Sequence, residues 1–200
     1  MSLGDPYVSI VELENRLGTT DNGTFTALID AASRRVEDFT RRQFNQATTA
    51  TARRFRAADP LRLPVDDFYT LTDLAVVVGS TTLTSDQIDP RPWDGIVNGQ
   101  GGWPFFDLFR VNGIWPNSRR ANVTVTAKWG WVAVPEGIKQ ATLDVAAVMS
   151  YGVGSAPSQR KSEQLGDHLV TLSDPSLTAD NVPAELVSAE QYRRKIFGVA

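Results

Sequence analysis

Side chains that commonly carry chemistry are sparse in this sequence. His168, in the run GDHLV, is the only histidine, and the chain contains no cysteine. A lone histidine could serve as a general base, but it cannot anchor the usual zinc ligand sets and no nucleophile motif accompanies it. We therefore interpret His168 as a structural residue. We expect no catalytic residue, no metal, no cofactor and no disulfide.

One adjacent pair of carboxylates, Asp66 and Asp67, follows the proline and valine of LPVDDFYTL. On a strand, neighbouring side chains point to opposite faces, so these two would not share a proton or a metal ion. A turn cap or a hydrogen-bonded corner is the favoured interpretation. A carboxylate-dependent hydrolase that uses Asp66 and Asp67 ranks third among the functions considered.

Five tryptophans gather in the middle of the chain: Trp93, Trp103, Trp115, Trp129 and Trp131. Exposed aromatic rings on a sheet can stack on sugars or bases, and they also fill cores and subunit interfaces. We favour a core or interface role, because the strand expected to bear Trp129 is amphipathic in the ordinary way.

Length and composition set further bounds. The 200 residues, with 42% hydrophobic and 22% charged side chains, suit one globular domain that spans residues 1–200. The net charge of −3 argues against a protein whose whole surface binds nucleic acid. No signal peptide begins the chain and no run approaches the ~18 apolar residues of a membrane span. We expect synthesis in a cytoplasm and no membrane partner.

The first 48 residues read as helical. Ser9 and Glu12 form a capping box that begins a helix over Ser9–Leu17, and Gly18 is placed to end it. A second helix is predicted from Thr24 to Arg42, because its apolar residues recur with a period of 3.6.

The middle of the chain changes to a period of two and is rich in glycine, proline, threonine and valine. We expect the strands 52–57, 61–65, 74–78, 81–83, 106–111 and 123–129, the first of them at a sheet edge and the third and fourth as a hairpin. Residues 89–104 hold too much proline and glycine for any regular element, so a long loop is predicted there.

A strand leads directly into a helix within residues 122–152. Pro135 suits the first position of that helix, and Ala141, Val145 and Val148 lie on its apolar face. The helix is either a core helix or a subunit contact. A flexible loop is expected over 152–161, a short strand over 165–172 and a final helix from Ala184 to Phe197. The predicted fold class is α+β, with a helical body of about four helices (5–48 and 135–200) and a β-rich insertion (50–131) between the second and third long helices.

Several blocks of sequence, taken in order, resemble the head–tail connector (adaptor) proteins of tailed bacteriophages and of the related gene transfer agents. They are SIVELENRLG (9–18), LIDAASRRVEDF (28–39) with RRQF (41–44), RRF (53–55), LPVDD (63–67), VTVTAKWGW (123–131), VP (134–135) and IKQA (138–141). Each block alone is moderately specific, and the order and the helix–helix–β–helix layout carry the resemblance.

The resemblance implies a non-enzymatic structural subunit of the virion head–tail junction, assembled in the host cytoplasm. Members of the family form a ring, usually of twelve copies, beneath the portal protein. The ring extends the DNA channel, lies close to packaged DNA without specific contacts, and offers a docking surface to the next connector or tail-completion protein. A C-terminal segment commonly docks on the portal. In this sequence the segment would be Tyr192, Arg193, Arg194, Ile196 and Phe197.

Closed rings need two complementary side surfaces on each subunit. The helices from Thr24 and Pro135 are expected to provide them, through Arg34, Arg35, Arg41, Arg42, Ala141, Asp144 and Val148. Repeated around a ring, basic residues could form a continuous belt, and Arg53, Arg54 and Arg56 are the candidates that face the channel. The alternative function is a carbohydrate- or receptor-binding β-module of a virion that uses Trp93, Trp103 and Trp115.

Overall fold

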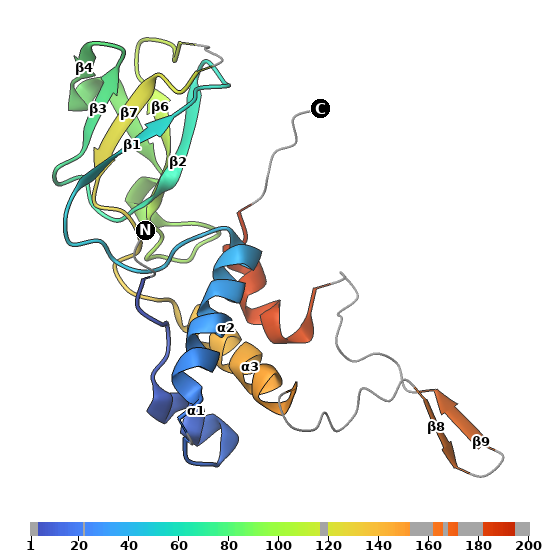
Figure 1. The fold of residues 1–200 in the computed structure, drawn as a ribbon. Coiled ribbons are helices and arrows are strands. Elements are labelled where there is room, and N and C mark those ends of the chain that lie inside the picture. The colour runs from blue at the N-terminus through green and yellow to red at the C-terminus, as the bar shows by residue number, and fades with distance from the viewer. Residues whose placement is uncertain are drawn as a thin grey trace. The chain divides into compact units, whose positions relative to one another are not determined.

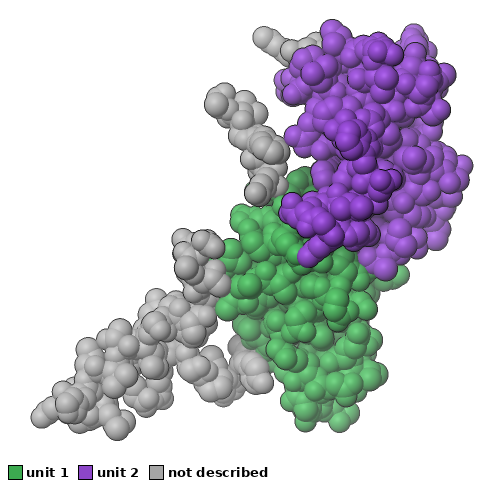
Figure 2. Space-filling model, turned by 180° about the vertical axis from the view of Figure 1, so that it is seen from behind, with its two compact units in different colours: residues 1–42, 134–200 green, residues 43–133 purple. Residues whose placement is uncertain are grey.

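The computed structural model describes residues 4–21, 23–116, 120–152, 162–165, 168–171 and 182–194. The chain divides into two compact units (Figure 2). Residues 1–42 and 134–200 form the helical unit, and residues 43–133 form the β unit. The fold is mixed α+β.

The helical unit contains α1 (Ile10–Leu17), α2 (Phe25–Thr40), α3 (Glu136–Gly152) and the 3₁₀ helix η3 (Ala184–Tyr192). Its part of the sequence also holds the antiparallel pair β8 (Ser162–Leu165) and β9 (His168–Thr171). Helices α1, α2 and η3 all contact α3. The core residues of this unit include Leu13, Ile29, Val36, Ile138 and Val145, each almost fully buried. Helix α3 is therefore the central element of the unit.

Both predicted ends of α1 are confirmed. The Ser9 side chain accepts a hydrogen bond from the Glu12 N–H (3.3 Å), and the Glu12 carboxylate accepts from the Ser9 N–H (2.6 Å). The bond from the Ser9 N–H, and a second one from the Ser9 hydroxyl (2.8 Å), hold the pKa of the Glu12 carboxyl below its usual value. Gly18 ends the helix in the left-handed conformation, with φ 66°.

Two other predicted helices are shorter than expected. Helix α2 ends at Thr40, because Arg41 adopts the left-handed conformation (φ 56°) and its N–H closes the last turn on the Glu37 carbonyl. The final helix was predicted to reach Phe197 but ends at Tyr192, in 3₁₀ geometry. Arg193 is extended there, so the α-helical prediction for this segment was wrong.

The β unit contains two antiparallel sheets (Figure 1). One has the order β1 (Thr51–Phe55), β7 (Val123–Ala127), β3 (Ala75–Val78), β4 (Thr81–Leu83). The other has the order β2 (Arg62–Phe68), β6 (Phe105–Arg110), β5 (Ile88–Arg91). Short 3₁₀ turns η1 (Ser85–Gln87) and η2 (Trp93–Gly95) flank β5. The predicted edge position of β1 and the predicted β3–β4 hairpin are confirmed.

The predicted loop over 89–104 was partly wrong, since β5 occupies its start. Pro90 lies within β5, and Pro64 lies within β2. Both strands are at the edges of the three-stranded sheet, where a residue without an N–H donor does not interrupt the ladder on its open side. Proline residues in this sequence therefore occur in edge strands as well as in loops.

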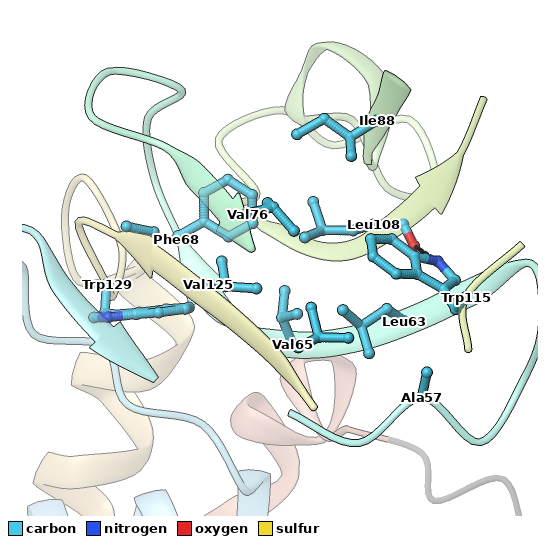
Figure 3. Packing of buried hydrophobic residues seen from close by; sticks show 12 residues of the cluster. Ala57, Leu63, Val65, Phe68, Val76, Ile88, Leu108, Trp115, Val125 and Trp129 are labelled. Atoms are coloured by element: carbon cyan, nitrogen blue, oxygen red, sulfur yellow. Dashed lines mark hydrogen bonds between the residues drawn. The ribbon is translucent and has the colours of Figure 1, made fainter. Parts of the chain in front are cut away.

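Both sheets contribute to one hydrophobic core (Figure 3). Val76 and Val125 from the four-stranded sheet pack with Leu63 and Leu108 from the three-stranded sheet. Trp115 lies among them, and its indole N–H donates to the Leu108 carbonyl (3.2 Å). The bond removes the cost of burying an unpaired polar group.

The first and last residues of the β unit meet at one place. The Ala47 N–H donates to the Trp129 carbonyl (2.9 Å), and the Gly130 N–H donates to the main-chain carbonyl of Asp67 (2.7 Å). Gly130 has φ 101°, and a Cβ on it would lie 1.7 Å from the Asn45 carbonyl oxygen. Only glycine fits this backbone conformation and this close approach.

Replacement of this glycine should therefore be much more damaging than replacement of a glycine in open space. We expect Gly130→Ala to lower the free energy of unfolding by at least about 3 kcal/mol, through the strained φ and the collision with Asn45. Gly79→Ala is the matched control, because Gly79 also has positive φ (62°) but nothing within 4 Å. That change should cost about 1 kcal/mol. Urea unfolding measures both, and equal losses would contradict the account.

Candidate functional site

The described part of the predicted portal-docking segment is held on the C-terminal end of α2. The Arg42 guanidinium donates through Nε to the Tyr192 carbonyl (2.8 Å), and the Arg194 N–H donates to the Thr40 carbonyl (2.9 Å). The Arg193 guanidinium lies 5.0 Å from the centroid of the Phe39 ring. These contacts satisfy a carbonyl that the helix itself leaves without a partner.

Tyr192 is largely buried, and burial raises the pKa of its phenol. It is therefore part of the helical core as well as of the predicted docking segment. Ile196 and Phe197 lie outside the described residues. The six residues 195–200 follow a fixed point, Arg194.

Some residues predicted for the subunit interface are buried in the structure, and others are exposed. Ala141 and Arg42 are buried within the helical unit, so their surfaces are already used by intramolecular contacts. Arg41 is exposed just after α2, and Val148 is exposed on α3. Those two positions remain accessible to a neighbour.

Three further interface candidates make ion pairs inside the helical unit. They are Arg34 with Glu37 (2.6 Å), Arg35 with Glu185 (3.1 Å) and Asp144 with Arg16 (2.5 Å). The last two pairs join different helices and are partly exposed, which limits the contribution of each to about 1 kcal/mol or less. The interface assignment of these residues stays a prediction.

The three arginines predicted to face a channel do not share a face. Arg53 and Arg54 are neighbours on β1, so their side chains point to opposite sides of the sheet. Arg53 pairs with Asp66 (2.7 Å) and lies 4.6 Å from the centroid of the Trp129 ring. Arg54 is exposed and donates to the Ala121 carbonyl (2.9 Å), and the exposed Arg56 follows the strand.

Charges in the β unit are mostly compensated within it. Residues 43–133 contain nine Lys and Arg and eight Asp, with no Glu, a formal net charge of +1. Ion pairs join Arg62 to Asp107 and Lys128 to Asp73, and the hydrogen bond that Lys128 donates to the Asp73 carboxylate raises the pKa of Lys128. A surface of this kind provides no strong positive field for DNA.

The three tryptophans of the sugar-binding alternative are not brought together. Trp115 is completely buried in the core. Trp103 is half-buried, with its ring 5.2 Å from that of Trp131. Of the three, Trp93 alone is well exposed, so these rings do not form a row on which a sugar chain could stack.

The two adjacent carboxylates have different partners and do not form a reactive pair. The Asp67 carboxylate is buried and accepts a hydrogen bond from the Trp131 indole (2.9 Å). Asp66 pairs with Arg53, as described above. Among the described residues, no group of three or more His, Cys, Asp or Glu side chains could hold a metal ion. His168 lies in β9, where no side chain is described.

One feature was missed by the sequence reasoning. The Arg91 guanidinium is stacked between two rings, 3.8 Å from the centroid of Trp93 and 4.6 Å from that of Phe109. Asp89 accepts hydrogen bonds from Arg91 Nε (3.0 Å) and Trp93 Nε1 (2.8 Å). The sequence DPRPW contained a signal for this cluster, because Asp89, Arg91 and Trp93 are spaced two residues apart, as on one face of a strand.

Comparison with known proteins gives similarity of fold. No protein-family profile matches the chain, and no curated protein matches it. A chain from the neck of an empty gene transfer agent (GTA) particle, computed with C6 symmetry, matches with a TM-score of 0.53 and 14% identity over 96% of this chain and 93% of that chain. A chain from the neck of a native GTA particle, computed with C12 symmetry, matches with a TM-score of 0.52 and 14% identity over 97% of both chains.

A third match comes from the virion of a native GTA particle, with a TM-score of 0.50 and 18% identity over 96% of this chain and 93% of that chain. The shared fold therefore includes nearly the whole length of each protein. Among the described residues, no helix has the length and the apolar character that a membrane crossing would require.

The assignment of Trp115 to the core and of Trp93 to the surface can be tested directly. Trp115→Ala should lower the free energy of unfolding by about 3–5 kcal/mol, because it removes a fully buried ring and leaves a cavity. Trp93→Ala is the matched control and should cost less than about 1 kcal/mol. Chemical denaturation followed by circular dichroism compares them, and a stable Trp115→Ala protein would refute the core assignment.

Proposed function

We propose that this protein is a structural, non-enzymatic subunit of the head–tail junction of a phage-like particle. In this role it forms a ring beneath the portal protein, extends the DNA channel and offers a docking surface to the next connector or tail-completion protein. The observation that carries the proposal is the shared fold over nearly the full length of chains from GTA necks. The β unit is then an insertion within the helical body of a connector.

We further propose that the ring contains twelve copies. Support comes from the C12 and C6 symmetries of the two neck assemblies that share the fold, since both are compatible with twelve subunits. The net charge of +1 in the β unit supports only non-specific proximity to packaged DNA. Of the predicted channel residues, Arg54 and Arg56 have the exposure that this role needs.

Docking on the portal is assigned to residues 195–200, which include Ile196 and Phe197. Tyr192 and Arg194 are held on α2, so they act as the fixed origin of the docking segment. A truncation that removed Tyr192 or the fully buried Ala189 would damage the fold together with the docking segment. The informative truncation therefore ends the chain at Arg194.

We expect the chain that ends at Arg194 to unfold at the same urea concentration as the full chain, because it keeps every described core contact. Its affinity for the portal of the same particle should fall by at least about tenfold, a loss of about 1.4 kcal/mol. Co-sedimentation with purified portal measures this affinity. Removal of residues 1–3 is the matched control and should leave binding unchanged. Undiminished binding by the shorter chain would refute the docking assignment.

A further inference from the structure

The charged side chains of the β unit are divided unequally between its two sheets. The strands of the three-stranded sheet contain three Arg and four Asp, whereas those of the four-stranded sheet contain two Arg and no Asp or Glu. The two arginines, Arg53 and Arg54, are neighbours on β1 and lie on opposite faces. Arg53 is in register with Val125, which is buried in the core, so Arg54 lies on the outer face.

The register of the strands shows which residues share this outer face. Residues directly opposite each other in an antiparallel sheet lie on the same side, and so do residues two positions apart on one strand. The outer face therefore includes Ala52, Arg54, Ala75, Thr82, Thr124 and Thr126. Apart from the arginine, these side chains are short, and three of them carry a hydroxyl group.

Three exposed arginines lie together at one end of the outer face, and they are called the arginine cluster below. The Arg54 guanidinium donates through Nη2 to the Ala121 carbonyl (2.9 Å), which places it beside Arg120. Arg56 comes two residues after Arg54 and is followed by the buried Ala57, so the alternation of the strand continues through it. The acceptor of Arg54 in this bond is a neutral carbonyl, which does not cancel the charge of the guanidinium.

Carboxylates near the outer face do not cancel this cluster. Asp73 pairs with Lys128 (2.9 Å), which follows Thr126 by two residues at the other end of the face. Asp59, three residues after Arg56, accepts hydrogen bonds from the N–H groups that begin the next strand, at 2.7 and 3.1 Å. Three arginines and this one aspartate leave a formal charge of +2 at the cluster.

The outer face lacks the features of a contact surface for another protein. Large apolar side chains are exposed elsewhere in the described chain, but none of them lies on β1, β7, β3 or β4. The buried centres of protein interfaces are rich in such side chains. A second copy of this chain carries a net charge of −3 over 200 residues. Double-stranded DNA is far more densely charged, with one negative charge per about 1.7 Å of its axis.

We propose that the outer face of the four-stranded sheet, with the arginine cluster at its edge, binds the phosphate groups of double-stranded DNA. Guanidinium groups match phosphate oxygens in geometry and charge, and threonine hydroxyls add neutral donors. The short side chains allow the DNA backbone to approach the sheet. Phosphate contacts read no base sequence, so they suit DNA of any sequence. The proposal rests on the proposed function, which supplies the DNA, and it names the face that meets it.

Fluorescence anisotropy of a short labelled DNA duplex, titrated with the purified full chain, tests the proposal. The wild-type chain should bind the duplex at low salt, and binding should weaken as salt rises because phosphate contacts release counterions. In Arg54→Gln/Arg56→Gln, the affinity at about 50 mM salt should fall by at least about tenfold. The slope of log affinity against log salt should decrease by roughly 0.9 for each lost contact.

The matched control is Arg53→Gln/Arg91→Gln. It removes the same formal charge, but from the inner face of β1 and from the three-stranded sheet. Its affinity for the duplex should stay within about twofold of the wild-type value, because neither side chain reaches the outer face. Glutamine keeps part of each side-chain stem for packing, and circular dichroism checks that both double variants remain folded.

Equal losses of affinity in the two double variants would overturn the assignment of this face. If the wild-type chain forms rings on its portal but does not bind the duplex, the DNA surface is wrong and the proposed function stands. If the duplex is bound through Arg54 and Arg56 but no ring forms on the portal, the surface stands and the head–tail role fails. Self-association that Arg54→Gln/Arg56→Gln abolishes, without binding of the duplex, would overturn the proposal in favour of a protein partner.

Discussion

The rest of this structure depends on one constraint. The two ends of the β unit lie side by side and are joined by hydrogen bonds. The Trp129 carbonyl accepts from Ala47, and Gly130 approaches the Asn45 carbonyl as closely as a residue without Cβ allows. Asp67, from β2, accepts hydrogen bonds from both Gly130 and the Trp131 indole. A segment whose ends meet in this way can be inserted into a helical chain without separating the helices on either side of it in sequence.

Contacts within the chain also decide which side chains remain accessible to partners. Several charged side chains of the β unit are engaged in pairs such as Arg62–Asp107 and Arg53–Asp66. Trp115, Trp129 and Trp131 are buried, and their indole N–H groups donate hydrogen bonds. The large apolar side chains that stay exposed in the β unit include Leu61, Leu71, Trp93, Ile96, Ile114 and Val132. In the helical unit, Val11, Val148 and Val187 are exposed. These features are the ones expected of a subunit whose work is assembly.

The local signals in the sequence were sufficient for the elements whose ends are set by neighbouring residues. The Ser9–Glu12 capping box and Gly18 defined α1, and alternation defined β7. Elements that depend on distant contacts were not predictable. Helix η3 ends where Arg194 binds the Thr40 carbonyl, and the burial of Trp115 depends on strands that are remote in sequence. The contact between Arg91 and Trp93 was overlooked because prolines concealed the strand period, although the spacing of the two residues was present in the sequence.

The most direct test of the account is electron microscopy of the purified full chain mixed with the portal of the same particle. The account predicts an added ring of density, coaxial with the portal and composed of twelve copies. Portals that retain their original outline, with this chain remaining unassociated in solution, would contradict a structural role at the head–tail junction.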